Sequence, residues 1–226
     1  MRRRSKQGAS AIEFAFSLLI LIPTLLGVMG IGFSMLHQLQ VIQLGRDAGS
    51  MYARKTDFTS PGAQKLLSQV AGSLGLTAST VSSTTGGTAG STVVILSAIQ
   101  YVNASLCGQA SPPLAPDAAD CPNIGNWVFG ARIVVGNKTV AASNLGAPDS
   151  TVTIAPNGTI TISQMCLKPG DKVTGYNPWT SATITNANNA LSTIQSQPIY
   201  VSEATAYGFR LPPFSSGTKV SSQVFF

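Results

Sequence analysis

Charge is scarce in this sequence, and so are the residues that usually carry catalysis. Only 10% of the 226 residues are charged, and His37 is the single histidine. Ser-His-Asp and Cys-His sites need a histidine within reach of the nucleophile, and His37 directly follows the longest apolar run. The eight acidic residues form no D-x-D or E-x-x-E pair, and the glycine-rich TTGGTAG lacks the lysine of a phosphate-binding loop. We therefore expect no enzyme, no catalytic residue and no cofactor.

Cysteine is also rare, with three residues in the chain. Cys107 and Cys121 bracket the proline-rich GQASPPLAPDAAD, and Cys166 lies further along. No C-x-x-C spacing occurs, so we expect no metal site. In an oxidising compartment, a Cys107–Cys121 bridge would close a short loop and stabilise the fold by about 3 kcal/mol. Cys166 is then a buried thiol, or it replaces one of the other two in the bridge.

The sequence has one long apolar run, and the rest of the chain is organised around it. Phe14 to Leu36 is a run of 23 residues without a charge. A helix covers about 30 Å of hydrocarbon in about 20 residues, so we predict a membrane-spanning helix over residues 9–36. A buried helix of a soluble protein is one alternative. A secretory signal peptide is another, although its apolar region is about 7–15 residues long and ends at a small-x-small site.

The residues before this run are basic, and they set its expected orientation. The leader 1–8 holds Arg2, Arg3, Arg4 and Lys6, which supply four of the +6 net charges and leave the rest of the chain near +2. That remainder gives no reason to expect a nucleic-acid partner. By the positive-inside rule, the N-terminus lies in the cytoplasm, the chain crosses the lipid bilayer once, and the large domain lies outside.

A carboxylate at the edge of the apolar run does not suit a plain anchor. Glu13 is followed directly by Phe14 and the span, and a charge there is costly unless it finds water or a partner. The order is a basic leader, then Gly8, then Glu13 five residues later, then an unbroken apolar helix. This order resembles the class III signal of type IV pilin-like proteins. The resemblance implies that a prepilin peptidase cuts between Gly8 and Ala9.

The particular form GASAIEF, followed by a span with Pro and Gly and then by GRDAGSMYAR, resembles the TadE-like minor pilins (pseudopilins) of the Tad, or type IVc, pilus. CPNIGNWVFGARIVVGN and the closing VSSQVFF are similar to the periplasmic part of longer members, although TadE-like chains are often shorter. The resemblance implies a role in pilus assembly, with Glu13 and Phe14 acting in assembly. Its implied partners are the prepilin peptidase, other pilins and inner-membrane platform proteins. An uncleaved, membrane-anchored binding or adhesion domain is the alternative.

The remaining pattern predicts an extracytoplasmic α+β domain over 56–226, joined to the span by a juxtamembrane helix over 37–55. The long helix is expected to end near Arg54. Ser60-Pro61 predicts the start of a second helix over Gly62–Leu74, with one side formed by Leu66, Leu67, Val70 and Leu74. Both helices are expected to pack on a mainly antiparallel sheet.

Alternation of apolar and polar residues locates the strands of that sheet. Asn157-Gly158 predicts a hairpin between the third and fourth of them. Trp127, Phe129, Ile133 and Val135 alternate and are expected in the core, and one helical turn is expected near Asn189–Ile194 in a long loop. The expected strands are Thr92–Val102, Trp127–Val135, Val152–Ala155, Thr159–Ser163, Ile199–Tyr207 and Val220–Phe226.

Overall fold

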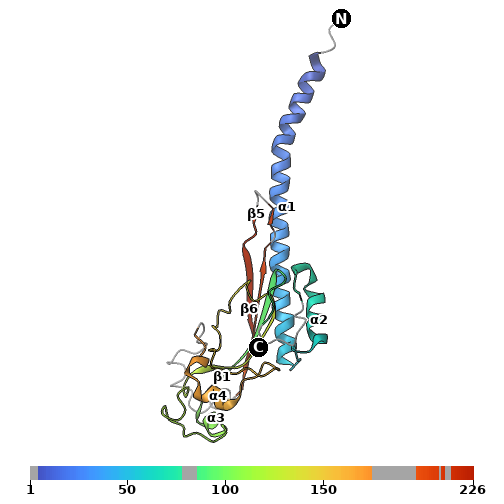
Figure 1. Ribbon diagram of the computed structural model, residues 1–226. Coiled ribbons are helices and arrows are strands. Elements are labelled where there is room, and N and C mark those ends of the chain that lie inside the picture. Colours follow the sequence, from blue (N-terminus) through green and yellow to red (C-terminus); the bar gives the residue numbers. More distant parts are fainter. Residues whose placement is uncertain (1–4, 78–85, 175–196, 209, 212–214) are drawn as a thin grey trace.

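The computed structural model describes residues 5–77, 86–174, 197–208, 210–211 and 215–226. Its main feature is a 49-residue helix, α1 (Ser5–Ala53), whose first half projects from a folded domain that packs on its second half (Figure 1). The helix ends one residue before the predicted Arg54. Lys55 adopts a left-handed conformation with φ 63, and Thr56 N–H reaches back to the Met51 carbonyl at 3.0 Å. This backbone motif commonly ends helices and satisfies their last carbonyls.

The second helix is α2 (Pro61–Val70), followed by a 3-10 turn, η1 (Gly72–Leu74), so the two together cover the predicted range. Ser60 caps it as expected, since its hydroxyl accepts from Ala63 N–H at 3.4 Å. The predicted apolar side is wrong in part, because Leu66 and Val70 are 56% and 62% exposed.

A buried polar side chain explains why α2 exposes part of its predicted apolar side. Gln64 is buried and donates from Nε2 to the Phe58 carbonyl at 2.9 Å. With Gln64 and its neighbours Ala63 and Leu67 turned inward, Leu66 is carried to the outside.

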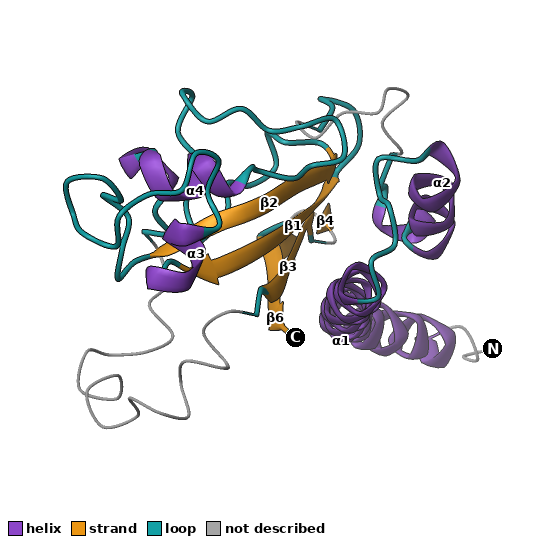
Figure 2. Cartoon of the chain, turned by 90° about the horizontal axis from the view of Figure 1, so that it is seen from below, coloured by secondary structure: helices purple, strands orange, loops and turns teal. Residues whose placement is uncertain are grey.

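A four-stranded antiparallel sheet in the order β2-β1-β3-β6 forms the centre of the domain (Figure 2), which confirms the α+β class. A two-stranded extension, β4 with β5, interrupts the connection from β3 to β6. Four of the six predicted strands are confirmed within one or two residues at each end. The observed strands are β1 (Thr92–Tyr101), β2 (Trp127–Gly136), β3 (Ile199–Tyr207), β4 (Arg210–Leu211), β5 (Ser215–Ser216) and β6 (Lys219–Phe225).

The sheet is covered on both faces. One face packs against the C-terminal half of α1 and against α2, in a cluster that includes Val41, Leu44, Leu67, Leu96 and Ile133. The other face is covered by loops and two short helices, α3 (Ala104–Gly108) and α4 (Ile162–Leu167), around Ile99, Phe129 and Val201. Side chains of both parities along β1 and β2 are therefore buried, which strict one-sided alternation does not predict.

A bulge explains how the four predicted core residues of β2 divide between these faces. The register runs Ala98 with Ala131 and then Ile99 with Phe129, so Gly130 is the extra residue. All four side chains are buried as predicted. Ile133 and Val135 belong to the cluster under α1, while Trp127 and Phe129 belong to the cluster on the opposite face.

The predictions of strands over Val152–Ala155 and Thr159–Ser163 are wrong. A tight turn does form, with Gly158 at φ 83 and Ala155 N–H donating to the Thr159 carbonyl at 2.8 Å. Beyond it, one bridge pairs Thr159 with Ala131. Thr161 then caps α4, its hydroxyl accepting from Gln164 N–H at 3.4 Å, so the chain turns into a helix. The helical turn predicted near Asn189–Ile194 lies outside the described residues.

Candidate functional site

The first half of α1 presents a continuous apolar surface. α1 is long and apolar enough to cross a membrane, with a mean hydropathy of 2.3 over its most apolar window, of which 6% is buried. Large side chains on all sides of the helix are exposed, including Phe16 at 66% and Val28 at 71%. An apolar surface of this extent indicates a contact with lipid or with other helices.

The residues expected to act in processing and assembly lie together on α1. Gly8 and Ala9 are within the first turns of the helix, and Glu13 and Phe14 follow about one turn later. Glu13 is exposed and Phe14 is 66% exposed. The Ser17 hydroxyl donates to the Glu13 backbone carbonyl at 2.9 Å and not to the Glu13 carboxylate.

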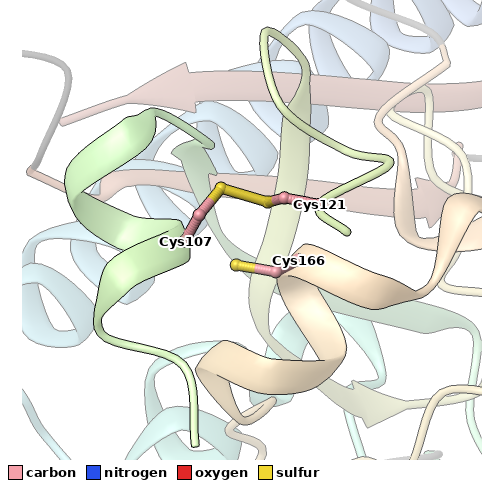
Figure 3. Close-up of side chains that lie close together, drawn as sticks. All are labelled: Cys107, Cys121 and Cys166. Atoms are coloured by element: carbon pink, nitrogen blue, oxygen red, sulfur yellow. A yellow bond between two sulfur atoms is a disulfide. The ribbon is translucent and has the colours of Figure 1, made fainter. Parts of the chain in front are cut away.

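At the far end of the molecule, the structure joins Cys107 to Cys121 in a disulfide, the pair expected from the sequence. Cys107 lies on α3, Cys121 lies in the loop before β2, and the free Cys166 lies on α4 (Figure 3). All three sulfur atoms lie within 4.8 Å of one another. The sequence spacing gave no sign of this triad, because the packing of α3 on α4 creates it.

The burial and low reactivity of the three cysteines indicate a structural role. All three cysteines are fully buried, and the Cys166 thiol approaches the Leu106 carbonyl at 3.8 Å. Burial raises the pKa of this thiol, which keeps it protonated and weakly nucleophilic. The disulfide fastens α3 to the loop before β2, and the free Cys166 side chain of α4 packs against it.

Two buried charged residues on the sheet were missed by sequence reasoning. Arg132 donates from Nη1 to Ser97 Oγ at 3.3 Å and lies over the Phe129 ring, 5.3 Å from its centroid. Burial lowers the Arg132 pKa, and the nearby Glu203 carboxylate opposes that shift. Glu203 accepts from Asn144 N–H at 2.8 Å and from the Ser143 hydroxyl. Nothing in the apolar runs around these residues predicted that their charged groups would be enclosed.

Asp171 is a further buried acid that the sequence did not indicate. It is fully buried at the end of η2 (Pro169–Asp171), and neither carboxylate oxygen has a hydrogen-bond partner among the described residues. Burial raises its pKa to about 8. At neutral pH the carboxyl group is therefore mainly protonated and uncharged.

A cavity of about 510 Å³ opens between the end of α1 and the sheet. Two of its lining residues, Gly130 and Ala131, are small residues at the β2 bulge. The rings of Tyr52 and Tyr200 meet edge to face beside it, with centroids 5.3 Å apart. The volume is that of a small-ligand pocket. The other lining residues are Lys55, Thr56, Asp57, Ala98, Gln100, Ile133, Asn157, Thr159, Met165 and Pro198.

Comparisons of the chain with protein-family models, with curated proteins and with solved structures give no match.

Proposed function

We propose that this protein is a TadE-like minor pilin (pseudopilin), a structural component in the assembly of a Tad (type IVc) pilus. The observation that carries the proposal is the division of α1. Its first half is bare and apolar, while Val41, Leu44 and Ala48 in its second half hold the folded domain. A single continuous helix of this kind can stay in the membrane, or pack among other helices, while it presents the domain to water.

The proposed location is the bacterial inner membrane, with one span. The basic leader favours a cytoplasmic N-terminus and an extracytoplasmic, periplasmic domain. The buried Cys107–Cys121 disulfide supports this orientation, because disulfides persist in oxidising compartments. The partners proposed are the prepilin peptidase, other pilins and the inner-membrane platform proteins of the pilus machinery.

Glu13 has a specific task in this proposal. Cleavage after Gly8 would create an α-ammonium group at Ala9, at the apolar end of α1. In a bundle of such helices, the exposed Glu13 carboxylate of one subunit would pair with the ammonium of a neighbour. Each charge needs this partner, because an unpaired charge in apolar surroundings is costly.

N-terminal sequencing of the membrane-extracted protein tests the assignment. We expect the mature chain to begin at Ala9. Gly8→Leu should block processing, because a bulky side chain replaces the hydrogen at the cleavage site. Gly27→Leu is the matched control: a Cβ there meets nothing within 4 Å, so the same change in the same helix should leave cleavage intact.

Two results would reject the minor-pilin function. An intact Met1 supports the alternative, an uncleaved anchor carrying an envelope binding or adhesion domain. A chain that begins beyond residue 36 supports a secreted protein whose apolar run is removed.

A further inference from the structure

The cavity beside the end of α1 exists because the sheet carries small side chains at that point. The register places Ala131 of β2 opposite Ala98 of β1, and both residues line the cavity. The next pair on the same face is Ile133 with Leu96, whose large side chains pack in the cluster under α1. The cavity therefore begins where the paired side chains of the sheet change from large to small.

The β2 bulge adds to this space, because its extra residue is a glycine. A Cβ at Gly130 would lie 3.3 Å from Met165 Sδ and 3.9 Å from Gln100 Oε1, and both of these residues line the cavity. Protein interiors are close-packed, so larger side chains at positions 98, 130 and 131 would fill such a space. The small residues instead leave about 510 Å³, which lies within the range of roughly 300–1,000 Å³ found for ligand pockets.

Charge is confined to the exposed edge of the cavity. The apolar lining residues that are 2–8% exposed are Ala98, Ala131, Ile133 and Met165. Among the described lining residues, the ionised side chains are Lys55 and Asp57, and both are exposed. Burial raises the pKa of the Tyr52 phenol, so that side chain also stays uncharged. A ligand group deep in the cavity must therefore be neutral, because an ionised group would lose its water there without gaining a charged partner.

Hydrogen-bonding side chains of one kind surround the apolar lining. Thr56 and Gln100 are half-buried, while Asn157 and Thr159 are exposed. The Thr159 hydroxyl donates to Asn157 Oδ1 at 2.7 Å, and its oxygen can still accept a hydrogen bond. Hydroxyl and amide groups offer both donors and acceptors. They match the hydroxyl groups of a ligand, which also donate and accept, better than they match a purely apolar ligand.

We propose that this cavity is a binding site for a neutral, hydroxyl-rich ring, such as a mono- or disaccharide. The C–H face of the ring lies on the apolar lining, and its hydroxyl groups meet the threonine and amide side chains. The edge-to-face pair of Tyr52 and Tyr200 forms an aromatic wall beside it. This inference goes beyond the pilin function and depends neither on cleavage nor on assembly.

Saturation-transfer difference NMR on the full-length chain in phosphatidylcholine nanodiscs tests the proposal. Nanodiscs avoid detergents with a sugar headgroup, which would compete for the cavity. The probes are glucose, galactose, mannose and N-acetylglucosamine, with indole as an apolar ring for comparison. We expect saturation transfer to at least one of the sugars, strongest at the C–H protons of one ring face.

Two substitutions in the lining make the test specific to this cavity. Ala98→Leu should fill the space, so it should abolish the sugar signal and raise the melting temperature. Ala119→Leu is the matched control, because Ala119 is exposed in a loop and does not line the cavity. Thr56→Val removes one hydroxyl at nearly constant volume. It should weaken sugar binding on the order of 2- to 10-fold and leave any indole signal unchanged.

Three results would overturn the proposal. A sugar signal that survives in Ala98→Leu would place the binding elsewhere on the chain. Transfer to indole without transfer to any sugar would reject the ligand class, and would indicate a pocket for an aromatic side chain of a protein partner. Transfer to none of the probes would reject the cavity as a site for small neutral rings. Cleavage after Gly8 is measured separately, so these results do not decide the pilin assignment.

Discussion

Gly49 of α1 lies directly against the ring of Phe226, the residue that follows β6. A Cβ at Gly49 would lie 2.9 Å from Phe226 Cδ2, 3.0 Å from Cζ and closer still to Cε2. Backbone hydrogen bonds to Tyr200 in both directions, at 2.9 and 3.1 Å, hold the Phe226 main chain in place, so its ring can move away from α1 only by a change of side-chain rotamer. The close approach of α1 to the sheet edge therefore depends on the missing side chain at position 49.

The first prediction concerns this contact. Gly49→Ala should destabilise the domain by up to about 2 kcal/mol, since an overpacking cost of about 1–3 kcal/mol is offset only in part by the roughly 1 kcal/mol by which alanine favours a helix. The melting temperature of the detergent-solubilised chain measures the effect. Gly62→Ala in α2 is the control, because a Cβ there meets nothing within 4 Å, and it should be neutral or stabilising.

The double variant Gly49→Ala/Phe226→Ala makes the test specific. With the ring removed, adding the methyl group at position 49 should no longer be destabilising. If Gly49→Ala lowers stability equally with and without the Phe226 ring, then the close approach is not the cause.

The elements with long, periodic sequence signals were predictable. The uncharged run before His37 and the cap at Ser60 located both helices, and apolar runs located the four strands of the sheet. These signals sufficed for the α+β class. The strand predictions for the short segments were wrong because the same local sequence can form either a strand or the start of a helix. Thr159 to Ile162 alternates like a strand, yet Thr161 can equally cap a helix, and in the structure it does.

Features that depend on tertiary contacts could not be predicted. Gln64 turns inward to reach the Phe58 carbonyl, which no periodicity records. The approach of Cys166 to the disulfide follows from the packing of α3 on α4, and Asp171 is buried next to Lys172, which bridges to the distant Val128 of β2. The roles of Gly8, Ala9, Glu13 and Phe14 come from the resemblance to TadE-like pilins and remain predictions.

The second prediction concerns the disulfide. Mass mapping under non-reducing conditions should find Cys107 joined to Cys121 and Cys166 free. Replacing both bridged cysteines by serine should cost about 3 kcal/mol, the loop-closure value for a sequence separation of 14. Single variants are less clean, because the two remaining sulfurs would lie within 4.8 Å and could pair.

Cys166→Ser is the matched control for this loss, since it changes a buried sulfur without opening a loop. It should leave the Cys107–Cys121 peptide unchanged and cost clearly less than the double variant. Detection of Cys166 in a bridge, or of three free thiols, would refute the pairing.

The third prediction concerns Asp171 and pH. Burial raises the pKa of this acid from 3.8 to about 8, so the folded state holds a proton that the unfolded state releases. The contribution of this bound proton to the free energy of unfolding is fully present below about pH 4. It is lost as the pH rises to about 8, and over this range the free energy of unfolding falls by up to about 1.4 kcal/mol per pH unit.

Thermal unfolding between pH 5 and pH 9 measures this dependence. Asp171→Asn has no carboxyl proton to lose, so it should flatten the decline and stabilise the protein at pH 8–9 relative to the unsubstituted chain. Asp149→Asn, at an exposed acid in the preceding loop, is the control and should leave the decline in place. An identical decline in Asp171→Asn would show that Asp171 ionises freely in the folded state.

The last prediction concerns Glu13, on the premise that the chain assembles as a pilin. Glu13→Ala makes the span more apolar, so α1 should still insert. Cleavage at Gly8 should survive at least in part, because the glycine is the main requirement of the peptidase. Assembly should fail, since each subunit would leave an α-ammonium unpaired in an apolar bundle, at a cost on the order of 3 kcal/mol.

Membrane fractionation and pilus yield from the same cells separate these steps. We expect protein to accumulate in the inner membrane while pilus yield falls. Asp47→Ala, an exposed acid on α1 beyond the apolar run, should have no such effect. Normal piliation of the Glu13→Ala strain would show that this carboxylate only reaches interfacial water, and the uncleaved anchor would then be the better account of α1.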